Sequence, residues 1–196
     1  MTIRHSEACE RNKEPILNIL KDVLSECSHV LEIGTGTAQH AVHFGKNLRH
    51  LIWQTSDLKD NIPDIAERIN LEGAENVIMP LEIDVTENPW PIDTADAVFT
   101  ANTLHIMSWS SVPHFFNGVG KILTSSGILC IYGPFKYSGD FTSESNRDFD
   151  EWLKSRNPES GIRDFENVNK LASDQGLKLI KDYSMPANNQ LIVWRK

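Results

Sequence analysis

The chain is poor in cysteine. Its three cysteines, Cys9, Cys27 and Cys130, are widely separated in the sequence. They form neither the close pairs of zinc and redox motifs nor the dense set of a disulfide-stabilised fold, so we expect free, reduced thiols. His40 and His43 lie three residues apart, but no carboxylate or cysteine at matching spacing completes a metal site. The sequence therefore predicts no bound metal.

Basic residues and long apolar runs are also scarce. The chain has 19 Lys and Arg against 27 Asp and Glu, a formal net charge of -8, and no basic run. Binding of a phosphate backbone needs concentrated positive charge, so nucleic acid is not an expected partner. No stretch reaches the roughly 18 apolar residues of a membrane span, and the opening residues lack the apolar core of a signal peptide. We expect a cytoplasmic protein without a membrane partner.

Apolar runs alternate with segments of helical periodicity, and 196 residues suit one well-cored domain, residues 1–196. An amphipathic helix is expected over 8–24. The alternation then predicts strands at 29–34, 51–57, 76–85, 95–102 and 128–133, and helices at 37–48, 62–71 and 110–123, the last followed by a turn at 124–127. Such alternation indicates an α/β, doubly wound, mostly parallel sheet.

The C-terminal part follows another pattern. A polar loop over 134–146 precedes helices near 147–154 and 163–174. Strand-like runs at 177–185 and 190–196 are joined by the short "PANN", which predicts an antiparallel hairpin. A seven-stranded sheet of this plan resembles the Rossmann-like fold of the class I methyltransferases. The polar loop has the length at which loops are often functional lids.

The stretch "VLEIGTGTAQH" contains a glycine turn. The dinucleotide fingerprint GxGxxG is satisfied at Gly34 and Gly36, but Gln39 stands where its third glycine belongs. Glu32, just before the turn, would repel a pyrophosphate and suits a cationic ligand such as S-adenosylmethionine. Asp57 ends the second strand, where doubly wound sheets place an acid that binds ribose hydroxyls. Asp57 alone is explained equally well as a helix cap.

The run "LEIGTGTA" resembles motif I of S-adenosylmethionine-dependent methyltransferases, E/DxGxGxG, with Ala38 in place of the last glycine. The resemblance implies that the turn approaches the methionyl end of the cofactor. It also implies that Asp84 accepts from the adenine amino group and that a following backbone N–H meets the ring. The implied cofactor-binding residues are Glu32, Gly34, Thr35, Gly36, Asp57, Asp84, Val85 and Asn102.

Longer motifs resemble one family. "SEACERNKEPIL", "WQTSD", "TANTLHIMSW", "GPFKYSGDFTSESNRDFD", "GIRD" and "MPANN" together are similar to the methyltransferase-like 26 family, also described as domain of unknown function 938. The resemblance spans nearly the whole chain. It implies a class I fold and binding of S-adenosylmethionine, and it names no substrate.

Several of these motifs are expected at one sheet edge. His105 follows the fourth strand and is the candidate general base, because its pKa ordinarily lies near neutral pH; a hydrogen-bonded structural histidine is the alternative. Tyr132, at the end of the fifth strand, is the second candidate catalytic residue. "ANTLH" lacks the prolines and the aromatic residue of the "NPPY" tetrad, so methylation of a nucleobase amino group is not supported.

Candidate substrate-binding residues lie in three segments. In "TSESNRDFD", Arg147 is a partner for a substrate carboxylate and Glu144 for an amine or hydroxyl, although the segment also reads as a capped helix start. Further candidates are Arg11, Asn12 and Asn188. By contrast, Trp109 and Trp152 are expected to be packing residues.

The sequence favours an S-adenosylmethionine-dependent methyltransferase with a small-molecule substrate. A non-catalytic protein that binds S-adenosylmethionine as a sensor or partner subunit stays open, because the same cofactor residues serve both. A nicotinamide-dependent oxidoreductase is the third reading. Tyr132 and Lys136 match its YxxxK spacing, but the intervening Gly-Pro cannot form the helical turn that the pair requires.

Overall fold

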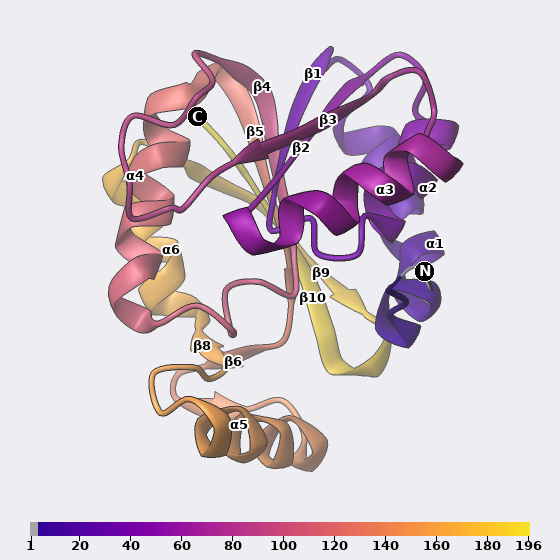
Figure 1. The fold of residues 1–196 in the computed structure, drawn as a ribbon. Helices are drawn as coiled ribbons and strands as arrows, with labels where there is room; N and C mark the ends of the chain where they lie inside the picture. Colours follow the sequence, from indigo (N-terminus) through magenta and orange to yellow (C-terminus); the bar gives the residue numbers. More distant parts are fainter. Residues whose placement is uncertain (1–3) are drawn as a thin grey trace.

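The computed structural model describes residues 4–196 and contains a seven-stranded sheet in the order β3-β2-β1-β4-β5-β10-β9 (Figure 1). The first five strands are parallel, and β10 is antiparallel to both of its neighbours. The strands are β1 (His29–Ile33), β2 (Ile52–Asp57), β3 (Val77–Glu82), β4 (Ala95–Ala101), β5 (Leu123–Gly133), β9 (Lys178–Met185) and β10 (Asn189–Arg195). The predicted fold class is confirmed.

Helices cover both faces of the sheet, because each face buries its own apolar cluster. One cluster joins the sheet to α1 (Glu7–Val23), α2 (Gln39–Asn47) and α3 (Ile62–Glu72). The other joins it to α4 (Val112–Ile122) and α6 (Phe165–Asp174). Strands covered on both faces are buried almost without interruption rather than at every second residue, as β1 and β4 are. Within residues 4–196, no helix combines the length and apolar character needed to cross a membrane.

Three segments differ from the sequence-based prediction. The expected turn at 124–127 belongs to β5, which begins at Leu123 and contains an irregularity where Ser126 adopts a φ of 68°. The expected polar loop at 134–146 contains the short strands β6 (Phe135–Tyr137) and β7 (Asp140–Phe141), and they pair in a small sheet with β8 (Arg163–Asp164). β3 ends at Glu82, earlier than predicted.

Helix α5 (Glu144–Arg156) lies apart from the large sheet, below β6 and β8 in Figure 1. It starts at Ser143, whose hydroxyl accepts from the Asn146 N–H at 3.2 Å, so the segment is a capped helix start. The Asn146 side chain donates to the Asn188 carbonyl at 2.9 Å. Asp150 accepts from the Ile162 N–H at 2.7 Å. These two buried side chains fix α5 to the rest of the chain.

Candidate active site

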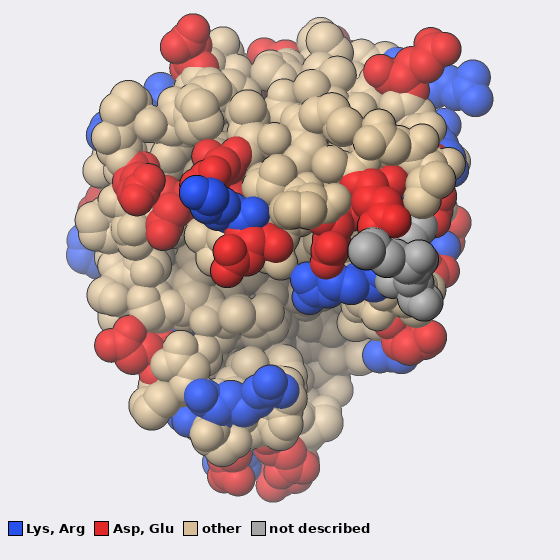
Figure 2. Space-filling model, viewed as in Figure 1, with Lys and Arg blue, Asp and Glu red and all other residues tan. Residues whose placement is uncertain are grey.

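A cavity of about 680 Å³ lies at the carboxyl ends of β1, β2, β3 and β4. The segments that follow these strands line it, together with the first turn of α1 and one residue of α5. Figure 2 shows the surface hollowed between α5 and the rest of the chain. Doubly wound sheets bind ligands at this edge, and the volume is within the range of small-molecule sites.

The glycine turn between β1 and α2 lies against β2. The N–H groups of Gly34 and Thr35 both donate to the Ser56 carbonyl at 3.0 Å. Gly34 has a φ of 73°, and a Cβ at this residue would lie 2.8 Å from the Thr103 hydroxyl oxygen. Gly36 has a φ of 61°, and a Cβ there would meet nothing closer than a backbone oxygen at 4.0 Å. Gly34 is therefore required by packing and Gly36 by its backbone conformation alone.

Ala38 occupies the third position of the glycine motif and keeps the conformation of a glycine. Its φ is 57°, and it forms the N-cap of α2 without a side-chain hydrogen bond. Left-handed backbone is unfavourable for an alanine. Its methyl group is fully buried in the cluster beneath α2, and this burial offsets part of the cost. The departure from the motif thus leaves the shape of the turn unchanged.

Asp57 connects β2 to the glycine turn. One carboxylate oxygen accepts from the Gly36 N–H at 2.7 Å, and the other accepts from the Leu58 N–H and the Asn61 amide, both at 2.8 Å. The side chain lines the cavity. Because a carboxylate offers about four acceptor positions, Asp57 keeps capacity for a ligand hydroxyl group.

Asp84 and Val85 lie just beyond β3 and also line the cavity. One oxygen of Asp84 accepts from the Thr86 hydroxyl at 2.7 Å and from the Thr86 N–H at 2.9 Å. These bonds lower the pKa of Asp84, so it is ionised at neutral pH. The structure thus brings Asp57 and Asp84 together at one end of the cavity.

Glu32 is placed differently from the sequence-based expectation. Its side chain is 1% exposed, is absent from the cavity lining, and accepts from the Trp53 indole at 3.0 Å and the Thr35 hydroxyl at 3.3 Å. Burial raises its pKa to about 8, so it is mostly uncharged at neutral pH. The expectation that Glu32 presents a negative charge to the ligand is therefore wrong. Instead, Glu32 holds the base of the turn through its hydrogen bond with Thr35.

The segment after β4 contributes Asn102 and His105 to the cavity. Asn102 has a φ of 57°, and its N–H donates to the Tyr132 carbonyl at 2.9 Å. His105 is 5% exposed, and burial, together with the nearby positive charge of Arg163, lowers its pKa to about 4. The imidazole is therefore neutral at pH 7 and is able to accept a proton.

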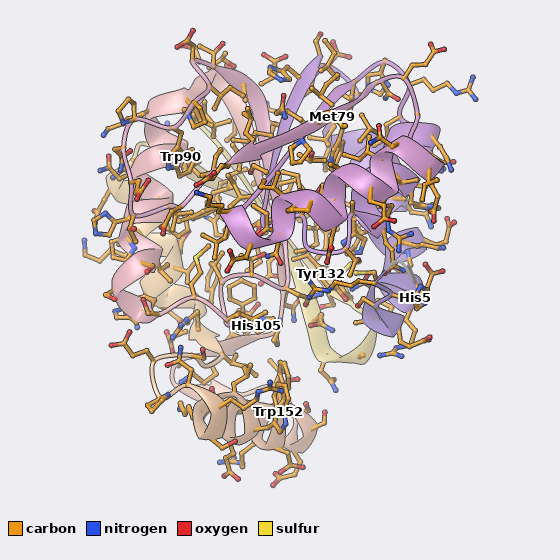
Figure 3. The ribbon with its side chains drawn as sticks, in the orientation of Figure 1. His5, Met79, Trp90, His105, Tyr132 and Trp152 are labelled. Atoms are coloured by element: carbon orange, nitrogen blue, oxygen red, sulfur yellow. The ribbon has the colours of Figure 1, made fainter. Side chains whose placement is uncertain are left out.

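Tyr132 and Asn12 are buried and are absent from the cavity lining, and Figure 3 shows Tyr132 and His105 near the lower end of the sheet. Burial raises the pKa of Tyr132, and a hydrogen bond with Asn12 opposes that effect. The Asn12 oxygen also pairs with His40 Nε2 at 2.6 Å. Asn12 thus connects α1 with α2 and β5.

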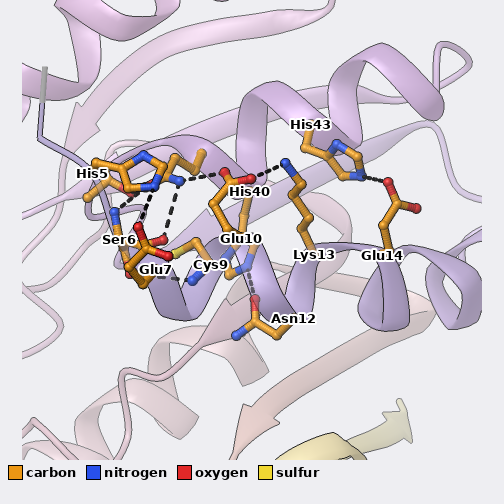
Figure 4. A network of polar contacts seen from close by, with 12 residues as sticks. His5, Ser6, Glu7, Cys9, Glu10, Asn12, Lys13, Glu14, His40 and His43 are labelled. Carbon is orange, nitrogen blue, oxygen red and sulfur yellow. Dashed lines mark hydrogen bonds and ion pairs between the residues drawn. The ribbon is translucent and has the colours of Figure 1, made fainter.

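The first turn of α1 forms part of the cavity wall, but through residues other than the predicted Arg11 and Asn12. Ser6 and Cys9 line the cavity. Gln39, at the start of α2, accepts from the Ser6 N–H at 2.6 Å and donates to Glu10 at 2.7 Å. Figure 4 shows this network of contacts between the two helices. Among residues 4–196, no three His, Cys, Asp or Glu side chains come close enough to hold a metal ion.

The remaining candidate residues are exposed and lie outside the cavity lining. Glu144 and Arg147 form an ion pair at 3.6 Å in the first turn of α5. The Asn188 amide donates to Ser145 at 3.4 Å, so the turn between β9 and β10 lies beside the start of α5. The structure thus groups Glu144, Arg147 and Asn188, whereas Arg11 lies on α1.

Residues 3–196 match a family model described as "Protein of unknown function (DUF938)". The chain belongs to the DUF938 family. This assignment agrees with the motifs of the sequence, and it extends over almost the entire chain.

Solved structures with the same fold are methyltransferases or are described as members of methyltransferase families. An O-methyltransferase family protein from Burkholderia thailandensis superimposes with a TM-score of 0.84 at 14% identity, over 97% of this chain and 57% of that one. Human N-acetylserotonin methyltransferase in complex with S-adenosylmethionine superimposes with a TM-score of 0.82 at 16% sequence identity, over 97% of this chain and 53% of that one. An O-methyltransferase family 2 protein from Planctomyces limnophilus, in complex with apigenin, superimposes with a TM-score of 0.75 at 16% sequence identity, over 94% of this chain and 61% of that one.

These likenesses show that the chain has the fold of the class I methyltransferases. The chain spans little more than half the length of these proteins.

Proposed function

We propose that the chain is an S-adenosylmethionine-dependent methyltransferase that acts on a small molecule. The observation that carries the proposal is the content of one cavity. Two acids, Asp57 and Asp84, and the glycine turn line one part of it, and the neutral imidazole of His105 lines another. A nucleoside with a cationic centre and a proton-bearing nucleophile are the ligands that suit these two groups.

The residues present fit S-adenosylmethionine. Asp57 is available to the ribose hydroxyl groups, and Asp84 and the backbone after it are available to the adenine. The open side of Gly36 leaves room for the methionyl end to approach the backbone. The ionised Asp84 favours a cationic ligand over a pyrophosphate, and the mostly uncharged Glu32 adds little to this preference. The solved relative that contains S-adenosylmethionine supports the same cofactor.

When bound, S-adenosylmethionine supplies a methyl group on a positively charged sulfur. The chain's own part is to orient the acceptor, exclude water and take up a proton. His105 takes the proton from the nucleophile, because its imidazole is neutral above about pH 5 and lies in the cavity wall. The start of α1 and the Phe149 side chain of α5 close the sides of the cavity against water.

The small-molecule substrate is supported by the size of the site, a cavity of about 680 Å³. Such a volume suits a cofactor together with one compact acceptor, and one of the similar solved structures is in complex with apigenin. We place the polar part of the acceptor near Glu144, Arg147 and Asn188, the exposed group beside α5. Tyr132, with Arg11 and Asn12, supports the cavity from the side of α1.

A transfer assay tests this function. The protein is incubated with methyl-tritiated S-adenosylmethionine and a fractionated small-molecule extract, and labelled products are separated by chromatography. The wild-type chain is expected to label at least one fraction, and His105→Gln is expected to label it far more slowly. Binding of the labelled compound with no labelled product in any fraction would instead support the sensor hypothesis.

A further inference from the structure

A series of aromatic rings runs from the cavity wall to the surface of α5. The imidazole of His105 meets the ring of Phe149 edge to face, with 5.4 Å between centroids. The Phe149 ring stacks on the Trp152 indole at 5.7 Å with an interplanar angle of 16°. The Arg156 guanidinium lies over the Trp152 indole, with 4.9 Å between its Cζ atom and the ring centroid. The series therefore begins beside the candidate base and ends in solvent.

Large apolar surface is exposed along this series. Trp152 is 51% exposed, which corrects the expectation that it is a packing residue. Ile106, which follows His105, is 59% exposed and lines the cavity, as Phe149 does. Apolar surface left in water at the mouth of a cavity indicates a binding site. Because Asn146 and Asp150 fix α5, these rings are held in place before any ligand binds.

We propose that Phe149, Trp152 and Ile106 form the acceptor subsite, and that the acceptor is a planar aromatic compound carrying a hydroxyl group on its ring. In this subsite, a flat ring system stacks against Phe149 and packs against Ile106, and its hydroxyl group points toward His105. A puckered aliphatic molecule of the same size loses the stacking contact. This inference rests on the proposed methyl transfer and specifies its substrate.

The weak basicity of His105 supports the same class. An imidazole whose pKa is about 4 takes a proton more readily from a more acidic nucleophile. An aromatic hydroxyl group, with a pKa of about 10 as in tyrosine, is far more acidic than an aliphatic alcohol. Both the geometry of the rings and the chemistry of the base therefore select an aromatic hydroxyl over an aliphatic one.

The transfer step balances as a simple displacement. The hydroxyl oxygen forms a bond to the methyl carbon, and the carbon–sulfur bond breaks with its electron pair left on sulfur. The hydroxyl proton passes to His105 and from there to water. The products are an aromatic methyl ether, the neutral thioether of the cofactor, and one proton.

Calorimetry on the chain saturated with S-adenosylhomocysteine tests the subsite without turnover. The probes are 2-naphthol and its saturated analogue decahydro-2-naphthol, which share the hydroxyl group and the carbon count. We expect 2-naphthol to bind about tenfold more tightly. In Phe149→Leu that preference should fall to about twofold or less, and Trp152→Ala should weaken 2-naphthol about threefold to tenfold.

Two controls separate the subsite from general effects. Trp109→Ala removes another half-exposed tryptophan, 40% exposed, outside the series, and should leave 2-naphthol affinity within about twofold. Affinity for S-adenosylhomocysteine should likewise stay within about twofold in all three variants. Equal binding of the two alcohols by the wild-type chain, or an unchanged preference in Phe149→Leu, overturns the inference and leaves the methyl transfer standing. Failure of the wild-type chain to bind S-adenosylhomocysteine overturns the proposed function itself.

Discussion

The two ends of the cavity are built in different ways. At the glycine turn, the wall is formed by backbone groups, by Asp57 at the end of β2 and by Asp84 two residues past β3. The Asp57 carboxylate accepts from two backbone N–H groups. Near α5, the wall includes Phe149, a side chain from a helix outside the large sheet, which meets the His105 ring edge to face and stacks on Trp152. The first end is determined by local sequence and the second by tertiary packing. Under the proposed function, the first end binds the cofactor and the second binds the methyl acceptor.

The largest expected effect separates the two ends by chemistry. His105→Gln should lower kcat about 10²- to 10⁴-fold, because the proton acceptor is lost, while affinity for S-adenosylmethionine changes less than about twofold. In the wild-type chain, kcat should be constant from about pH 6 to 8 and fall as the pH drops toward 4, where the imidazole becomes protonated. A kcat that is unchanged in the variant would contradict the role of His105.

The next comparison is between Gly34 and Gly36, the two glycines of the turn at the cofactor end of the cavity. Gly34→Ala should lower the free energy of unfolding by about 2–4 kcal/mol, because the new Cβ combines left-handed backbone with a collision against Thr103. Gly36→Ala, which meets open space, should cost only about 1–2 kcal/mol. Thr103→Ala should partly rescue Gly34→Ala and leave Gly36→Ala unaffected. Equal losses in urea denaturation of the two glycine variants would show that the collision does not occur.

The pH dependence of stability tests whether Glu32, the buried acid beneath the glycine turn, is uncharged. Its folded pKa of about 8 lies above that of the unfolded chain, so the folded state holds an extra proton between these values and loses stability as the pH rises. The wild-type chain should lose about 2 kcal/mol between about pH 6.5 and 8. Glu32→Gln keeps an acceptor for Trp53 and should show no such fall. Parallel pH profiles of the two chains would mean that Glu32 is ionised in the fold.

Asp57 connects the turn to the ligand. Asp57→Asn exchanges one acceptor oxygen for an amide that faces N–H donors, so affinity for S-adenosylmethionine should fall about tenfold to thirtyfold. Asp148→Asn, an exposed acid of α5, is the matched control and should change the affinity less than about twofold. Calorimetric titration of the three chains gives the comparison. Similar affinity in all of them would remove Asp57 from the cofactor site.

The smallest effect is expected at the acceptor end. Arg147 is exposed and pairs with Glu144 at 3.6 Å, so Arg147→Ala should change the free energy of unfolding by less than about 0.5 kcal/mol. Affinity for S-adenosylmethionine should not change, whereas KM for an acceptor with an anionic group should rise. A change in cofactor affinity would contradict the placement of Arg147 beside the acceptor.

The same contrast explains what the sequence could predict. The alternation of strands and helices along the chain and the terminal hairpin follow from apolar periodicity and short turns, and the structure contains both. Asp57 ends β2 as predicted, whereas Asp84 lies two residues past the end of β3. The direction of Glu32 could not be predicted, because a strand buried on both faces has no polar alternation to distinguish them. Phe149 and Trp152 lie three residues apart, which indicates one helix face but not that this face meets His105.

The most direct test of the central claim is a calorimetric comparison of S-adenosylmethionine and NADH on the wild-type chain. Because of Asp57 and Asp84, the chain should bind S-adenosylmethionine at least about a hundredfold more tightly than NADH, with one molecule bound per chain. Binding of NADH with equal or greater affinity at the same site would contradict the account.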